Sequence, residues 1–131
     1  MSDAPDTAAV EVDPLEGWAA ALAERLGAEG TIVAFDTVRV IVARDRWVDT
    51  IVAAREELEL FSWLSAIDWS KDLAVGVGVA EPDDLAERFE VLCRLSSVES
   101  DAGAIFVTTL PKDDPSIGSL TPHIGGAEWH E

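Results

Sequence analysis

The spacing of the hydrophobic residues changes repeatedly along this chain, and these changes restrict the possible folds more than any other feature. Apolar residues that recur every three or four positions form one face of a helix, and residues that alternate with polar ones form one face of a strand. Residues 13–30 have the helical spacing. Their apolar stripe consists of Leu15, Trp18, Leu22 and Leu26, and we therefore expect an amphipathic helix near the N-terminus.

The two ends of this helix carry their own signals. Asp13 can cap the first turn, Pro14 suits the first helical position, and Glu16 can reach back towards the cap. Gly27 or Gly30 supplies the stop. Before the helix, residues 1–12 are expected to form a flexible acidic tail, and residues 13–131 a single domain.

A hairpin and a second helix are expected next. Residues 31–44, TIVAFDTVRVIVAR, alternate as strands do and predict a tight turn near Asp36 and Thr37. Residues 46–60, RWVDTIVAAREELEL, return to the helical spacing, so we expect a second helix that is capped by Asp45. Its predicted apolar stripe consists of Val48, Ile51, Val52 and Leu58.

The second half of the chain is typical of strands. Residues 61–70, FSWLSAIDWS, are expected to pass from a helical turn into a short strand that ends at Asp68 and Trp69. Residues 71–86 contain glycines and a proline, which fits either a weak strand or a loop. Residues 87–97 and 104–110 predict two further strands. In the first of these, one face carries Phe89, Val91, Cys93 and Leu95.

The resulting order, α-β-β-α-β-β-β, limits the architecture. Helices on one face of a mostly antiparallel sheet are the simplest arrangement for this order, so we predict an α+β two-layer sandwich. A chain of 131 residues suits one such domain. No apolar run approaches the roughly 20 residues that span a bilayer, and the N-terminus resembles neither a secretory signal nor a transit peptide. We therefore expect a cytoplasmic protein without direct membrane insertion.

The chain is strongly acidic, with 26 Asp and Glu residues against nine Lys and Arg residues and a net charge of −17. Such a charge repels phosphate backbones, and direct binding of nucleic acid is not expected. The acidic residues are spread along the whole chain. They can form a solvated surface that keeps the protein in solution, or an acidic face that docks on a basic partner.

Candidate residues for metal binding or catalysis form no convincing set. His123, Glu128, His130 and Glu131 have suitable side chains for zinc, but their spacing does not form an H-E-x-x-H motif, so no metal site is expected. Asp68 can act as an acid or base, or can simply end a strand.

Two further motifs lack the context that catalysis or cofactor binding requires. Cys93 is a candidate nucleophile, although its alternating context favours a small buried residue, and a lone cysteine excludes iron–sulfur ligation. The GVG of residues 76–78 lacks the rest of a dinucleotide fingerprint.

Trp129 differs from the other tryptophans because it lies among glycines and charged residues in the terminal GGAEWHE. A large apolar ring in such a context can anchor a partner protein or can pack back on its own sheet, and the two readings remain open.

A resemblance to a known family emerges from four consecutive segments, FSWLSAIDW, ERFEVLCRLSS, AIFVTTLP and DPSIGSLTPHIGGAEWHE. Together they resemble the 30-kilodalton subunit of respiratory complex I, the NADH–quinone oxidoreductase of bacteria. Cys93 stands where the family usually has an aromatic residue. The matching positions outside the strand at 88–96 are Asp68, Asp114, Pro115, Ile117, Ser119, Leu120, Ala127, Trp129 and Glu131.

The resemblance departs from the family pattern at the end. The pattern continues past the glutamate as Arg-Glu, an aromatic-Asp pair and Phe-Gly-Ile, whereas this sequence ends at Glu131. A truncated or divergent paralogue, or a shortened polypeptide, would account for this, and we expect it to affect assembly rather than fold.

The resemblance implies an α+β two-layer fold, no redox cofactor and no catalytic residues of the chain's own. It implies a scaffold role in the hydrophilic arm on the cytoplasmic side of the membrane, beside the 49-kilodalton-type subunit and the terminal iron–sulfur cluster subunit, where electrons pass to quinone. The interface residues implied in this way are Ser119, Trp129, His130 and Glu131.

Three alternatives remain beside this scaffold hypothesis. The chain could be the equivalent subunit of a membrane-bound hydrogenase or another related dehydrogenase. It could instead be a small hydrolase or lyase that uses Asp68, His123 and His130, or a free-standing acidic interaction module.

Overall fold

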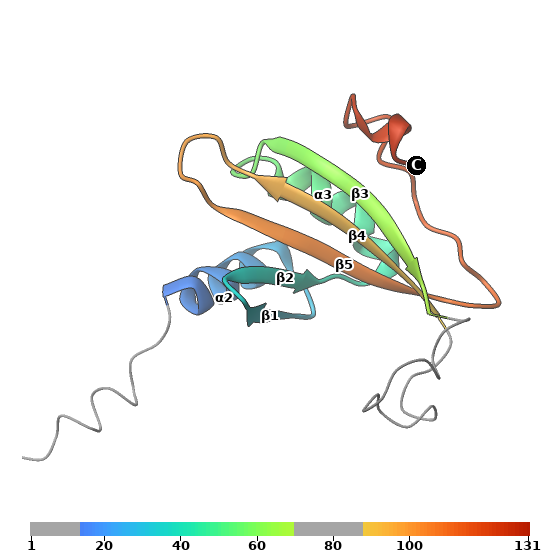
Figure 1. Cartoon of the computed structure of the whole chain (residues 1–131), viewed down its shortest axis with the longest axis horizontal. Helices are drawn as coiled ribbons and strands as arrows, with labels where there is room; N and C mark the ends of the chain where they lie inside the picture. The colour runs from blue at the N-terminus through green and yellow to red at the C-terminus, as the bar shows by residue number, and fades with distance from the viewer. Residues whose placement is uncertain (1–13, 70–87) are drawn as a thin grey trace, which may run out of the picture.

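The computed structural model describes residues 14–69 and 88–131. Within these ranges the elements follow one another in the predicted order of helices and strands, and residues 71–86, for which a weak strand or loop was predicted, lie outside them (Figure 1). The elements are α2 (Pro14–Leu26), β1 (Gly30–Ala34), β2 (Thr37–Ile41), η1 (Arg44–Arg46), α3 (Trp47–Ala54), β3 (Leu60–Asp68), β4 (Arg88–Ser96), β5 (Gly103–Pro111) and η3 (Ala127–Trp129).

The five strands form one sheet in the order β1-β2-β5-β4-β3. Strands β2 and β5 are parallel, and the other neighbours are antiparallel. The chain therefore leaves the first hairpin at β2 and returns beside it only with its last strand, after α3 and the β3–β4 pair have been formed. Strands β1 and β3 are therefore the two edge strands of the sheet.

The core lies between one face of the sheet and the two helices. Val40, Phe106, Cys93 and Leu64 lie opposite one another across four neighbouring strands and face this core. Leu22 of α2 and Ile51 of α3, each almost fully buried, cover them. Figure 1 shows both helices behind the sheet, which confirms the predicted α+β two-layer architecture.

Helix α2 begins at Pro14 and buries Leu22 and Leu26 as predicted. It ends at Leu26, and the next residue, Gly27, has a φ of +69°. The amide of Gly27 donates to the carbonyl of Glu24, and the amide of Ala28 donates to the carbonyl of Ala23, which together form a Schellman motif. The proposed cap, Asp13, lies outside the described residues.

Helix α3 differs from the expectation in its start and its buried face. Asp45 lies inside η1, and Arg46 precedes α3 without any side-chain cap, so the predicted capping by Asp45 is wrong. Val52 is 38% exposed because it points away from the side that carries Ile51. The buried positions of this short helix are Trp47, Thr50, Ile51 and Ala54.

The helical turn expected at the start of residues 61–70 is absent. Instead, β3 is a nine-residue strand that pairs with β4 along its whole length, with an irregularity between Phe61 and Trp63. The pairing with β4 satisfies the backbone N–H and C=O groups of these residues, which in a helical turn would have bonded to one another. Of the helices in the described ranges, none combines the length and the apolar character required to cross a membrane.

Candidate partner interface at the C-terminal segment

After β5 the chain continues as residues 112–131, here called the terminal segment, which returns along the β3 edge of the sheet (Figure 1). Its apolar residues follow the spacing of a helical turn. Leu120, Ile124 and Ala127 are 0%, 2% and 0% exposed and belong to the main core. Burial of these three side chains attaches the segment to the domain, since apolar area removed from water is the largest favourable contribution to such packing.

Two arginines on either side of α3, Arg44 in η1 and Arg55 directly after the helix, bind the backbone of the terminal segment. Arg44 donates to the carbonyl oxygen of Asp114 at 2.6 Å and also forms an ion pair of 3.4 Å with its carboxylate. Arg55 donates to the carbonyl oxygen of His123 at 3.1 Å. These contacts satisfy carbonyl groups in a part of the chain that forms no strand or long helix.

The side chain of Glu131 closes the terminal segment into a loop. Its carboxylate accepts hydrogen bonds from the Ser119 hydroxyl at 2.7 Å, the Leu120 amide at 2.7 Å and the Thr121 hydroxyl at 2.5 Å. Partial burial raises the pKa of Glu131, but the hydrogen bonds from Thr121, Ser119 and Leu120 outweigh this effect and lower the pKa below its usual value. The ionised form of Glu131 therefore holds the segment closed.

His130 and Trp129 are adjacent but have opposite environments. The His130 ring meets the ring of Phe61 edge to face, with centroids 5.3 Å apart, and its Nδ1 accepts a long hydrogen bond of 3.4 Å from the Leu64 amide. Trp129 is 87% exposed. Simple packing of this tryptophan back on its own sheet, one of the two readings of the sequence, is therefore not what the structure has.

A cavity of about 330 Å³ lies between the terminal segment and β3. Gly118 lines this cavity, and on its other side the glycine packs against α3, where a Cβ atom at this position would lie 2.7 Å from Cγ2 of Val48. Its lining residues are Trp47, Leu64, Ser65, Ala66, Val91, Ile117, Gly118, Ser119, His130 and Glu131.

The four interface residues implied by the resemblance therefore lie together at one end of the molecule. Ser119, His130 and Glu131 make contacts within the chain that shape the terminal segment. Trp129 projects from it into solvent. The arrangement can present one aromatic side chain, on a short 3₁₀ turn, beside an apolar cavity.

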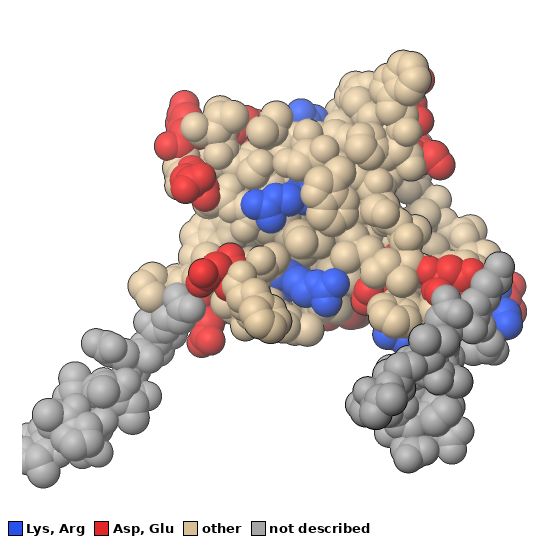
Figure 2. Space-filling view, viewed as in Figure 1, with Lys and Arg blue, Asp and Glu red and all other residues tan. Residues whose placement is uncertain are grey.

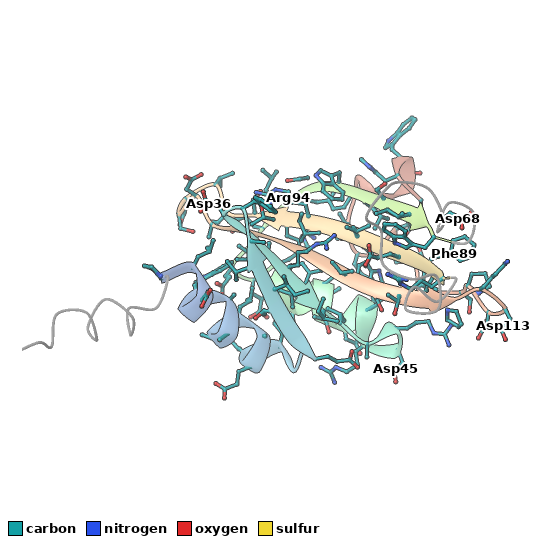
Figure 3. All side chains as sticks on the ribbon, turned by 60° about the horizontal axis from the view of Figure 1, so that its bottom comes forward. Asp36, Asp45, Asp68, Phe89, Arg94 and Asp113 are labelled. Atoms are coloured by element: carbon teal, nitrogen blue, oxygen red, sulfur yellow. The ribbon has the colours of Figure 1, made fainter. Side chains whose placement is uncertain are left out.

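The other candidate residues do not join this site. Asp68 lies at the exposed end of β3, opposite Phe89 in the register (Figure 3), and His123 is exposed. In the described ranges, His, Cys, Asp and Glu side chains form no group of three that could hold a metal ion. Burial raises the pKa of the Cys93 thiol to about 12, so the predicted buried role of Cys93 is confirmed and the thiolate needed for nucleophilic attack is disfavoured.

Three residues that position the terminal segment were missed in the sequence. Arg44, Arg55 and Gly118 act on partners about 70 residues away in the chain. Local propensity and periodicity do not indicate contacts between residues so far apart in the chain. The sequence placed the two arginines only near the ends of a predicted helix, and the glycine only in a predicted loop.

Comparison with protein families shows to which family this chain, including its terminal segment, belongs. A family model for the 30 Kd subunit of respiratory-chain NADH dehydrogenase matches residues 40–131, from β2 through the end of the terminal segment. A search of curated proteins found no match. Because the family match covers more than half of the chain, it confirms the resemblance inferred from the residues: this protein belongs to the family of the 30-kilodalton subunit of respiratory-chain NADH dehydrogenase.

Proposed function

We propose that this protein is a non-catalytic scaffold subunit of the hydrophilic arm of a respiratory NADH–quinone oxidoreductase, and that it binds its neighbours through the terminal segment. Membership of the family supports a role as a complex I subunit. The observation that carries the finer proposal is the exposure of Trp129 on a segment that three buried apolar side chains and the Glu131 hydrogen bonds hold in place.

An exposed tryptophan on an ordered turn is suited to binding a protein partner. Burial of its ring removes a large apolar area from water, and little conformational entropy is lost because the turn is already formed. The proposed partners are the 49-kilodalton-type subunit and the terminal iron–sulfur cluster subunit, in an arm on the cytoplasmic side of the membrane. Electron transfer to quinone then takes place in these neighbours.

The test is a quantitative co-purification from the protein's own organism. Tagged protein is recovered from membranes in mild detergent, and the other hydrophilic-arm subunits are quantified by mass spectrometry. We expect Trp129→Ala to weaken the association by about 2 kcal/mol, or roughly 30-fold in affinity, as for a central aromatic contact. Its matched control is Phe35→Ala, because Phe35 is an aromatic residue that is 99% exposed and lies on the β1–β2 turn.

The outcomes separate the alternatives. Recovery of complex I subunits that depends on Trp129 but not on Phe35 supports the proposal. Recovery of hydrogenase subunits would assign the chain to that related machine. Recovery of the protein alone would contradict the scaffold role, and equal recovery with both variants would contradict the role of the terminal segment.

A further inference from the structure

The face of the sheet that points away from the helices carries an ordered row of side chains. One row crosses all five strands in register and the next row lies beside it along the same face, and we call these two rows the open sheet face. The first row is Ile32, Arg39, Ile105, Arg94 and Trp63, and the second is Gly30, Ile41, Val107, Leu92 and Ser65.

The open sheet face is mostly apolar, yet it carries two arginines. Ile32 in the first row is 51% exposed, whereas Leu92 and Val107 in the second row are only 6% and 2% exposed, so the first row is the accessible part of this face. Arg39 and Arg94 are separated by Ile105 on the strand between them. Two strand spacings place the Cα atoms of these arginines about 10 Å apart. In a chain with a net charge of −17, the expectation is that basic side chains find acidic partners.

Arg39 and Arg94 do not follow this expectation. Among the described residues, neither forms an ion pair or a hydrogen bond. Arg25 binds Glu57 and Arg44 binds Asp114. Carbonyl groups or an aromatic ring engage the remaining described arginines, which are Arg46, Arg55 and Arg88.

The surroundings of these two arginines contain few acidic groups. Within the described strands, the alternation of side chains places Glu90 as the one acidic residue on this side of the sheet. Figure 2 views the sheet from this side and shows basic side chains in the middle of a largely uncharged area, with most of the acidic residues towards the margins.

The position of Arg94 is also favoured by its neighbour on β5. A Cβ atom at Gly103 would lie 2.8 Å from Nη2 of Arg94, so the guanidinium group lies over bare backbone at this point. A guanidinium group that rests on the sheet keeps its donors available for a planar, bidentate contact with a carboxylate. Figure 3 shows Arg94 rising from β4 among the side chains of this region.

We propose that the open sheet face is a docking surface for a second protein partner, whose contact surface is apolar and carries carboxylates that pair with Arg39 and Arg94. Charge complementarity selects this occupant. A purely apolar partner would remove water from the two guanidinium groups without replacing its hydrogen bonds, which costs free energy. Carboxylates on the partner would offset this desolvation cost and fix the orientation of the partner on the sheet.

Two other occupants fit less well. A second copy that docked by the same face would bring arginines against arginines around a two-fold axis, which is repulsive. A nucleic acid would be repelled by the net charge of −17. This second surface adjoins the terminal segment at Ser65, which also lines the cavity there. Its arginines lie on β2 and β4, and the inference does not depend on the function proposed for the terminal segment.

The test uses a photoreactive cross-linker in place of Ile32 in the full chain, expressed in its own organism. Ile32 lies beside Arg39 in the first row and is 51% exposed, so the probe reaches the proposed partner without disturbing the core. A probe at Val98, which is 70% exposed on the β4–β5 turn, measures the background. We expect one adduct, specific to position 32, whose cross-linked peptide lies next to Asp or Glu residues of another protein.

The variant that tests the charges is the double reversal Arg39→Glu with Arg94→Glu. We expect it to reduce the adduct at least about tenfold, because like charges now meet at the interface. The control is the double reversal Arg25→Glu with Arg46→Glu. It gives the protein the same net charge as the first double variant but places both changes on the helical side, and it is expected to retain the adduct. Thermal melts of both double variants confirm that each is folded.

Three results would overturn the proposal. One is an adduct at position 32 that is no stronger than the background at position 98. Another is an adduct to a second copy of this chain. The third is equal loss of the adduct in both double variants, which would point to net charge rather than to the open sheet face. Conversely, changing the mapped carboxylates to arginine should restore binding to the Arg39→Glu, Arg94→Glu protein.

Discussion

Glu131 shows how one side chain can determine the shape of a whole segment. Its carboxylate receives three hydrogen bonds from residues that lie ten to twelve positions earlier, so the last residue of the chain closes the turn that precedes η3. An amide and two hydroxyl donors favour the ionised carboxylate, which is a pure acceptor and a stronger one than the protonated acid. The closed form of the terminal segment is therefore linked to the ionisation of this carboxylate.

This linkage predicts that the closed form depends on pH. The folded-state pKa of Glu131 is lowered from its ordinary value of 4.5, so the stabilisation is present above that value and is lost as the pH falls through the folded-state pKa. We expect the amide signal of Leu120 in NMR spectra to be unchanged at neutral pH and to shift only below pH 4.5. In Glu131→Gln the same amide should lack this transition. A midpoint above 4.5 in the unchanged protein would contradict the assignment.

At the scale of elements, the contact between the terminal segment and α3 depends on the absence of a side chain. Gly118 passes so close to Val48 that a Cβ atom would lie 2.7 Å from Cγ2 of the valine. Valine is branched at Cβ and has few alternative rotamers in a helix, so it cannot easily move aside. The segment itself would have to shift.

We therefore predict that Gly118→Ala destabilises the protein by about 1–3 kcal/mol, as overpacking of a close contact generally does. Gly125→Ala is the matched control, because a Cβ atom at Gly125 would meet nothing within 4 Å. Chemical denaturation of both variants measures the difference. If Gly125→Ala were as destabilising as Gly118→Ala, the cause would be backbone conformation and not the contact with Val48.

At the scale of the whole molecule, the single cysteine of the chain, Cys93, can report whether the domain is folded. Cys93 of β4 is 0% exposed and belongs to the core cluster between the sheet and the helices. Its neighbours across the sheet are Leu64 and Phe106. We expect a reagent to reach this sulfur when the two layers separate, so that its modification reports the opening of the whole domain.

We expect Cys93 in the folded protein to react with a thiol reagent at pH 8 at least about a thousandfold more slowly than in denaturant. Opening of a stable core costs several kcal/mol, and burial raises the pKa of the thiol to about 12. The rate should rise in parallel with global unfolding as denaturant is added. Rapid modification without denaturant would mean that the β3 and β4 strands open locally.

Much of the architecture could be predicted because it depends on local patterns. The alternation in β4 indicated correctly that Cys93 and Leu95 face the core, and the helical spacing indicated Leu22 and Leu26 of α2. Where local patterns are ambiguous the prediction failed. The apolar residues at the start of β3 fit a helical turn or a strand, and only their pairing with β4 selected the strand.

The amino-acid sequence by itself determined the order of helices and strands, the buried faces of α2 and β4, and the family to which the chain belongs, because periodicity and motif order are local properties. Only the tertiary structure decided that β5 lies parallel to β2, that Glu131 meets Ser119, and that Arg39 and Arg94 share one open face. An alternating pattern indicates which side of a strand is buried, but it does not indicate which other strand pairs with that strand. The two proposed surfaces depend on those neighbours.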